Sequence, residues 1–311
     1  MRYPSRQLQQ VSHGESDIEN FFAKYGPSAR NCYDYCEPDA LHQYDDGVRD
    51  MIKEMSWDLI IDILTSNATD IKAEEGSHKV LLVGPQPNDR TAPRTTVVSK
   101  TVSQLLWARD SDEKWRNHRK LFNVLLREPS TKASSGLFFE PAFHDLCIHG
   151  TTFMIYPMER RDGNLNYIFT IPDIRRVKGS KLKLKRQQRV FFNEDNPIPH
   201  LRTDEYYQPT NPNHPSLDSF VYDPNSHQVS AFQATVGLEH DLKPGGVYAL
   251  RDLGERQEIH DLKIRIIVVL FGDREVIYRV NKVVYNTLRL QVFVLQVTEN
   301  HLYSHTSSGL F

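Results

Sequence analysis

The chain has 311 residues, of which 39% are hydrophobic and 25% are charged, and its formal net charge is only -2. This length predicts one large domain or two unequal ones, and the hydrophobic content is enough to bury a core, which excludes a mainly disordered chain. A near-neutral chain does not coat nucleic acid or a membrane with its whole surface, although it can still carry a local charged patch.

The sequence predicts an intracellular protein without a membrane partner. No apolar run approaches the ~20 residues of a membrane helix, and the beginning, Met1–Arg6, lacks the apolar stretch of a secretory signal. Three cysteines are too few for a disulfide scaffold, so we expect a reducing compartment.

Residues 1–70 have the pattern of a small helical domain. Helices are predicted over Asp17–Lys24 and over Asp45–Leu64, because apolar residues recur there every three or four positions. The polar stretch Ser66–Gly76 that follows is typical of a linker.

Residues 71–311 change in character to a mixture of strands and helices. Two short β-rich runs, Lys79–Gly84 and Thr95–Ser99, come first, and a helix is then predicted over Asp112–Leu126. This alternation favours an α/β or α+β architecture over an all-helical one.

A further helix is predicted over Gly136–His149, just before most of the strands. Pro141 is compatible only with the first turn of a helix, and Gly150 is well placed to end it. Strands are then predicted over 152–158, 167–171, 219–222, 229–236, 263–271, 275–280 and 290–297. The turn Arg161–Asn164 is expected to join the first two strands.

The stretch Arg175–Arg189 is rich in positive charge and has no acidic residue. Lys181, Lys183 and Lys185 alternate with leucines, which puts the three lysines on one face of a strand, a suitable surface for a phosphate backbone. The predicted nucleic-acid contacts are Arg175, Arg176, Lys178, Lys181, Lys183, Lys185, Arg186 and Arg189. The alternative is a solvated edge strand that its lysines protect against aggregation.

Glu140, Asp218 and Gln233 form a dispersed set of acidic and amide side chains, on a predicted helix, at the start of a strand and within the next strand. Metal-dependent phosphodiester hydrolysis needs oxygen ligands that hold Mg²⁺ beside the scissile phosphate. Two carboxylates and one amide oxygen from neighbouring strand ends would satisfy that need. Each residue alone is better explained as an ordinary polar residue: an exposed glutamate on a helix, an aspartate that begins a strand and a polar glutamine within a strand.

The order of these residues resembles the restriction-endonuclease-like core with its PD-(D/E)xK signature. More specifically, short stretches are similar to the Crinkler and retrotransposon-hot-spot group of effector-like proteins. These stretches are Ser77–Leu82, Gly136–Glu140 with His144, Leu217–Phe220, and Phe232–Val236 with His240. Upstream, Phe21-Phe22 and Tyr25–Arg30 resemble the tail of the ATPase module that often precedes the nuclease-like domain in that group. The resemblance covers most of residues 75–300.

This resemblance implies a mixed sheet flanked by helices, preceded by a small helical domain, in a nucleus-directed protein. It makes Glu140 and Asp218 Mg²⁺-binding acids and Gln233 the third ligand. The lysine of the signature is Thr235 here, and a neutral hydroxyl cannot stabilise developing negative charge as an ammonium does. His240 and Lys243 are the candidates to replace it.

Two functions are compatible with these features. The first is Mg²⁺-dependent hydrolysis of DNA, with a catalytic set of Glu140, Asp218, Gln233, Thr235 and His240. The alternative is a catalytically inactive protein of the same fold that binds DNA or another protein. No G-x-x-x-x-G-K-[ST] phosphate-binding loop occurs, so we expect no nucleotide cofactor.

Overall fold

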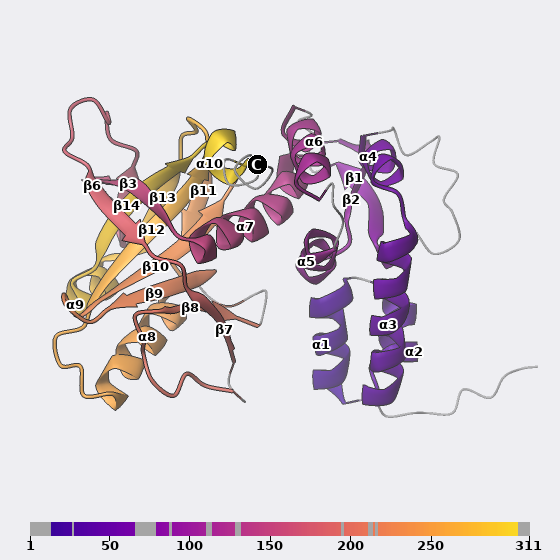
Figure 1. Cartoon of the computed structure of the whole chain (residues 1–311), viewed down its shortest axis with the longest axis horizontal. Helices are drawn as coiled ribbons and strands as arrows, with labels where there is room; N and C mark the ends of the chain where they lie inside the picture. The colour runs from indigo at the N-terminus through magenta and orange to yellow at the C-terminus, as the bar shows by residue number, and fades with distance from the viewer. Residues whose placement is uncertain are drawn as a thin grey trace, which may run out of the picture.

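The computed structural model describes residues 14–26, 28–65, 79–86, 89–109, 114–127, 132–193, 196–210, 214 and 217–303. Apart from one hairpin, helices dominate the described residues up to 149 and strands dominate from residue 151 onward, and the large sheet is mixed and flanked by helices (Figure 1). The α/β class is therefore confirmed. The predicted linker Ser66–Gly76, the domain boundary at residues 70/71 and the residues Ser77-His78 lie outside the described residues.

The N-terminal helices are α1 (Glu15–Tyr25), α2 (Ala29–Tyr35), α3 (Pro38–Glu54) and α4 (Trp57–Thr65). The prediction of one helix over Asp45–Leu64 is wrong, because the backbone is extended at Met55. Ser56 then accepts a hydrogen bond from the N–H of Leu59 at 3.1 Å and begins α4. The apolar side chains of this segment are nevertheless buried as the periodicity indicated.

A hairpin and three helices follow: β1 (Leu81–Gln86), β2 (Asp89–Val97), α5 (Lys100–Ala108), α6 (Lys114–Arg127) and α7 (Lys132–His149). Helix α5 has no counterpart in the sequence prediction, which ended a strand at Ser99. In the structure Ser99 is the cap of α5, since its Oγ accepts the N–H of Val102 at 3.2 Å. A capping serine next to a strand was therefore interpreted as part of the strand.

Helix α7 begins earlier than predicted, at Lys132, so Pro141 lies in its interior rather than in its first turn. A proline in that position removes one helical hydrogen bond. The buried aromatic rings on either side, Phe139 and Phe143, favour the continued helix because they pack into the core. Gly150 ends α7 as predicted, with a φ of 86°.

The large sheet has the strand order β6-β3-β14-β12-β10-β9-β8-β7. Its strands are β3 (Thr151–Pro157), β6 (Ser180–Leu184), β7 (Gln188–Phe192), β8 (Glu205–Pro209), β9 (Ser219–Asp223), β10 (Gln228–Thr235), β12 (Lys263–Phe271) and β14 (Gln291–Val297). Strands β10, β12 and β14 are parallel to one another, and β8, β9 and β10 form an antiparallel series.

The sheet is curled because its two outermost strands are consecutive in the chain. Only residues 185–187 separate β6 from β7, which lie at opposite ends of the strand order. Eight flat strands would be about 34 Å wide, whereas this link reaches about 14 Å. Helix α7 lies on the inner face, where its side chains share one hydrophobic cluster with residues of β6, β8 and β10.

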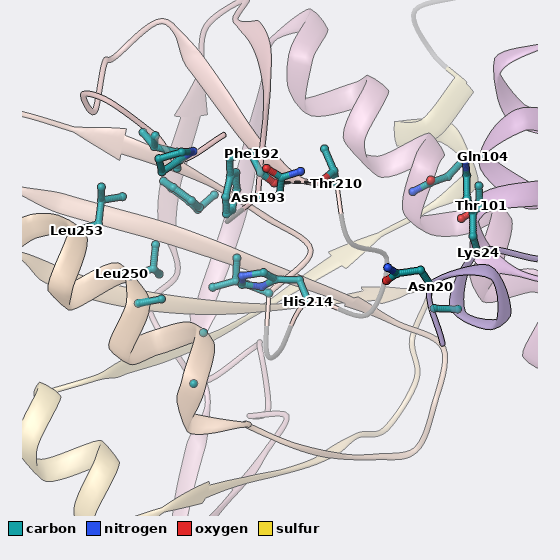
Figure 2. Close-up of a pocket in the computed structure, with 18 of the residues that line it drawn as sticks. Asn20, Lys24, Thr101, Gln104, Phe192, Asn193, Thr210, His214, Leu250 and Leu253 are labelled. Carbon is teal, nitrogen blue, oxygen red and sulfur yellow. Dashed lines mark hydrogen bonds between the residues drawn. The ribbon is translucent and has the colours of Figure 1, made fainter. Parts of the chain in front are cut away.

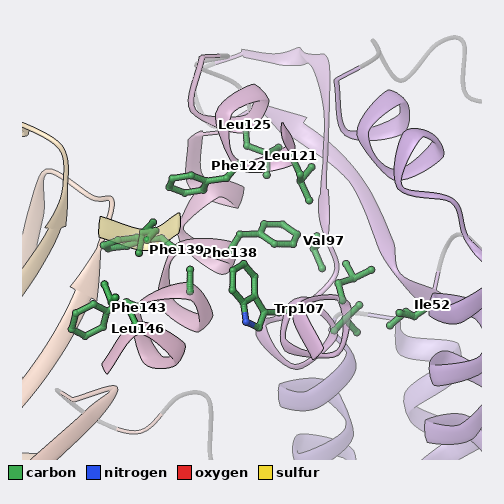
Figure 3. Packing of buried hydrophobic residues seen from close by; sticks show 14 of the residues in the cluster. Ile52, Val97, Trp107, Leu121, Phe122, Leu125, Phe138, Phe139, Phe143 and Leu146 are labelled. Atoms are coloured by element: carbon green, nitrogen blue, oxygen red, sulfur yellow. The ribbon is translucent and has the colours of Figure 1, made fainter. Parts of the chain in front are cut away.

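That hydrophobic cluster runs without a break from Phe21 in α1 to Leu302 near the C-terminal end. Figure 3 shows Phe138 and Phe139 of α7 and Trp107 of α5 packed within it. The N-terminal helices and the large sheet therefore share a core. A second hydrophobic cluster covers the other face of the sheet.

The second cluster packs a smaller sheet and two helices on the outer face. The small sheet has the order β11-β13-β5-β4, with β4 (Glu159–Asp162), β5 (Asn166–Thr170), β11 (Glu239–Asp241) and β13 (Ile277–Asn281). The helices are α8 (Pro244–Arg256) and α9 (Lys282–Leu288), and α10 (Glu299–Tyr303) follows β14. The predicted turn Arg161–Asn164 joins β4 to β5, not β3 to β5, because β3 pairs with β6 and β14 instead. Within the described ranges, every helix is too short or too polar to cross a bilayer.

Replacing Phe143 by alanine should lower the free energy of unfolding by about 3–5 kcal/mol. Its ring is fully buried and lies 5.4 Å from Phe232 and 6.0 Å from Phe153, centroid to centroid, so the substitution leaves a cavity between α7 and the sheet. Urea unfolding of the variant measures the change. Phe22→Ala, at a ring that is 53% exposed, should stay within about 0.5 kcal/mol of wild type. Equal effects of the two substitutions would contradict this packing.

Candidate active site

Glu140 and Asp218 are brought together by α7 and by the residue that precedes β9. Glu140 lies on α7, next to the turn that buries Phe143 against the sheet. The N–H of Asp218 donates to the carbonyl oxygen of Phe232 at 2.9 Å, and its Oδ2 accepts the N–H of Ala234 at 2.7 Å. These two bonds to β10 fix the Asp218 carboxylate near the carboxyl end of that strand.

A lysine from α5 lies between the two carboxylates. The Nζ of Lys100 is 2.6 Å from Oε1 of Glu140 and 3.6 Å from Oδ1 of Asp218. The hydroxyl of Ser99 donates to the carbonyl oxygen of Lys24 at 2.6 Å, which ties the start of α5 to α1. We call Lys100, Glu140 and Asp218 the Lys100 triad; their side chains are 20%, 13% and 17% exposed.

Burial and mutual attraction set the charges of the triad. Burial and the nearby Glu140 carboxylate raise the pKa of Asp218 to about 7, and Lys100 offsets this only in part. Burial alone would raise the pKa of Glu140, but the hydrogen bond from His144 and the charge of Lys100 outweigh it and lower that pKa. Burial also opposes the charge of Lys100, whose pKa is nevertheless raised by the two carboxylates. Near neutral pH, the triad combines a charged lysine, a charged glutamate and an aspartate that can exchange its proton.

A buried chain of hydrogen bonds runs from Glu140 through His144 and Tyr206 to Ser219. His144, one helical turn along α7, has its Nε2 3.3 Å from Oε1 of Glu140 and its Nδ1 2.7 Å from the hydroxyl of Tyr206. That hydroxyl is 2.6 Å from Oγ of Ser219. Burial lowers the pKa of His144, so the ring is neutral at pH 7. Since a carboxylate only accepts, Nε2–H donates to Glu140 and Nδ1 accepts from Tyr206, which holds the carboxylate in one orientation.

Gln233, Thr235 and His240 gather on the other face of β10. Oε1 of Gln233 accepts a hydrogen bond from the hydroxyl of Tyr278 at 2.7 Å, and Thr235 is hydrogen-bonded to His240. Side chains alternate along a strand, so Gln233 points away from α7, against which its neighbour Phe232 packs. Gln233 and His240 line a separate polar cavity of about 570 Å³. The structure thus brings Glu140 and Asp218 together and leaves Gln233, Thr235 and His240 as a second group.

The sequence prediction missed Lys100, the cation nearest to the two acids. Its candidate replacements for the motif lysine, His240 and Lys243, both line the polar cavity on the other face of β10. Lys100 is far from the motif along the chain, so no spacing rule around Thr235 could find it. The one local signal was Ser99, whose side chain is typical of a helix cap.

Glu140 and Asp218 are the residues of the triad that could hold a magnesium ion. Mg²⁺ is usually bound through one or two carboxylates, with waters and substrate phosphates completing its shell. Glu140 and Asp218 supply two such carboxylates, and one cation, the Lys100 ammonium, already contacts both. The described part of the chain contains no group of three or more His, Cys, Asp or Glu side chains that could hold a metal ion. Glu140 and Asp218 are the two carboxylates that the structure brings together, whereas the amide of Gln233 is hydrogen-bonded to Tyr278.

The basic stretch forms an exposed edge of the large sheet. Lys181, Lys183 and Lys185 are exposed and the leucines between them are more buried, as the alternation predicted. The other predicted basic contacts are exposed too, except Arg189, which pairs with Asp145 at 2.6 Å. In Figure 1, β6 lies at the left end of the sheet, on the far side of α7 from α5. The basic edge and the Lys100 triad are therefore separate surfaces.

Comparisons of the chain with protein-family models, with curated proteins and with solved structures gave no match.

The free energy of unfolding of the Asp218→Asn variant should increase relative to that of wild type as the pH rises. An acid with a raised pKa in the folded protein stabilises the fold while protonated, and this contribution is lost between about pH 4 and pH 7. The asparagine variant avoids the loss, so it should gain roughly 2–4 kcal/mol over wild type between pH 5 and pH 8. Urea unfolding at the two pH values measures it. The exposed Asp58→Asn should follow wild type; a parallel profile for Asp218→Asn would mean that its carboxyl group titrates normally.

Proposed function

We propose that this chain is a Mg²⁺-dependent, nuclease-like hydrolase of DNA phosphodiesters, with Glu140 and Asp218 as metal ligands. The observation that carries the proposal is the Lys100 ammonium, 2.6 Å from Glu140 and 3.6 Å from Asp218. It supplies the positive charge that the PD-(D/E)xK resemblance requires and that Thr235 cannot provide.

Each residue of the site has a role that follows from its chemistry. A magnesium ion bound here would neutralise the phosphate and activate a water molecule. Lys100 stabilises the negative charge that develops on the phosphate, because it is charged and shielded from bulk water. Asp218, as a metal ligand, would act as its charged carboxylate, because a bound cation favours the ionised form. His144 keeps Glu140 charged and correctly oriented.

The arrangement of elements around the site also supports the proposal. Glu140 on α7, Asp218 before β9 and Gln233 on β10 follow the order on which the resemblance to restriction-endonuclease-like and Crinkler proteins is based, although the strands expected as a hairpin between the first two do not pair with each other. After β10, α8 leads into β12, which runs parallel to β10. The same resemblance makes a nuclear location part of the proposal.

A catalytically inactive protein that binds DNA or another protein is the second candidate. Two observations favour it: Thr235 replaces the motif lysine, and the Lys100 ammonium already balances the carboxylates that a metal would need. In that case the Lys100 triad only stabilises the fold, and the exposed lysines of β6 bind the DNA or the partner protein.

Cleavage of DNA separates these two candidates. We expect wild type to cleave plasmid or oligonucleotide DNA with Mg²⁺ or Mn²⁺ and to lose activity in EDTA. Lys100→Met and Asp218→Asn should each reduce the rate at least about 100-fold, since the first removes the positive charge at the reacting phosphate and the second removes a charged metal ligand. Gel analysis of the products under single-turnover conditions gives the rates.

Lys120→Met is the matched control for Lys100→Met, because Lys120 also pairs with a carboxylate but is 56% exposed. It should keep the wild-type rate. Metal-dependent cleavage that survives Asp218→Asn would reject the assigned site, and absence of cleavage with either metal would favour the inactive candidate.

The basic edge should contribute to DNA affinity by binding backbone phosphates. Replacing Lys181, Lys183 and Lys185 together by glutamine should flatten the plot of log K against log salt by roughly 0.9 for each duplex phosphate that the variant no longer neutralises. Fluorescence anisotropy with labelled duplex DNA at several salt concentrations measures the slope.

The matched control removes three exposed lysines elsewhere, Lys53, Lys120 and Lys263. Replacing these three lysines by glutamine changes the net charge by the same amount as the β6 variant. The plot of log K against log salt should stay steeper for this control than for the β6 variant. If the two triple variants behave alike, the β6 edge is an ordinary solvated surface.

A further inference from the structure

A cavity of about 1030 Å³ opens beside the Lys100 triad. Thr101 and Leu217, which line it, are the chain neighbours of Lys100 and Asp218. Figure 2 shows Thr101 and Gln104 of α5 on one side of the cavity and leucines of α8 on the other. The volume is at the upper end of the range of small-molecule sites, about 300–1,000 Å³, so a ligand of nucleotide size fits.

One wall of this cavity is aromatic and apolar. Phe192 of β7 lies edge-on to both Phe220 and His214, with ring centroids 5.7 Å apart in each pair. Phe220 and Leu250 are buried and form the floor, whereas Phe192 is only half-buried. A half-buried ring at a cavity wall offers a flat apolar surface on which a nucleobase can stack.

The remaining wall carries amide groups. The side chains of Asn20, Gln104 and Asn193 line the cavity. An amide presents both a donor and an acceptor, which matches the mixed edge of a nucleobase better than it matches a lipid or an apolar peptide.

The cavity also favours a negative charge. The first turn of α8 lines it at Gly245 and Gly246, and no described side chain caps the N–H groups of that helix end, where a phosphate is stabilised. Arg256 adds an exposed guanidinium, while Lys24 is already paired with Asp45 at 2.7 Å. None of the described residues that line the cavity is Asp or Glu.

We propose that this cavity binds one unpaired nucleotide of a nucleic-acid strand, with its base on Phe192 and a phosphate near the start of α8. The inference rests on the proposed function, since it gives the substrate class of the same site: a strand with a base that is single-stranded or flipped out. A paired base cannot reach Phe192, because its faces are covered by its neighbours in the stack. The nucleotide next to the bound one then lies toward Lys100.

Affinity for a short strand tests this proposal without cleavage. Fluorescence anisotropy in EDTA compares a labelled single-stranded oligonucleotide with the duplex of the same sequence. Wild type should bind the single strand more tightly. Phe192→Ala should weaken that binding roughly 5- to 150-fold, the range found when an aromatic stacking platform is removed.

Phe191→Ala is the matched control, since Phe191 is the neighbouring ring on β7, is 47% exposed and does not line the cavity. It should bind like wild type. A second pair of variants preserves the apolar core: Ala249→Trp places bulk at an exposed position in the cavity, and Ala108→Trp makes the same change at an exposed position outside it. Only Ala249→Trp should weaken binding of the single strand.

Equal affinity of wild type for single strand and duplex overturns the proposal, as does wild-type affinity in both Phe192→Ala and Ala249→Trp. Binding of adenosine monophosphate without binding of any strand also overturns it, because the ligand would then be a free nucleotide. These outcomes are distinct from a failure of the proposed hydrolysis. A protein that binds strands through the cavity but never cleaves them keeps this inference, and one that cleaves DNA independently of the cavity loses only this inference.

Discussion

The short link between β6 and β7 is the constraint on which the rest of the structure depends. It holds the two ends of an eight-stranded order within the reach of three residues, so the sheet must curl. The curl creates an inner face that one helix, α7, can fill with its aromatic side chains. Because Glu140 and His144 belong to the same helix, the packing that closes the core also fixes where these polar groups lie.

The charges of the triad are stable only as a group. Removing a buried carboxylate or ammonium from water is expensive, and a lone partner left behind would be strongly destabilising. Lys100 therefore makes it possible for two acids to approach each other in a largely buried place. The same competition between burial and attraction moves the pKa of Asp218 to about 7, and shifts of this kind are concentrated at functional sites.

Local signals in the sequence predicted much of the fold. Alternation identified the basic strand, and runs of β-branched and aromatic residues identified most other strands of the large sheet. Gly150 correctly marked the end of α7, because glycine readily adopts the positive φ of that position. The interior position of Pro141 was missed because packing outweighs local preference there. The break at Met55 was missed because the apolar periodicity continues through it, although Ser56 caps the next helix. Glu140 and Asp218, which the sequence predicted as one site, lie close together in the structure. The contacts of Lys100 with the two acids, and the contact of Gln233 with Tyr278, join segments that are distant in the chain. A local sequence pattern cannot predict such contacts.

The hydrogen bond from Ser99 to the carbonyl oxygen of Lys24 has a consequence for the history of the chain. It fixes the start of α5, and with it Lys100, to a helix near the N-terminus, while both acids come from much later segments. A recombination event that exchanged the first helix for an unrelated one would leave the strands intact but remove the support of that lysine. The position of Lys100 thus depends on a contact with the N-terminal helices as well as on the strand-rich part of the chain.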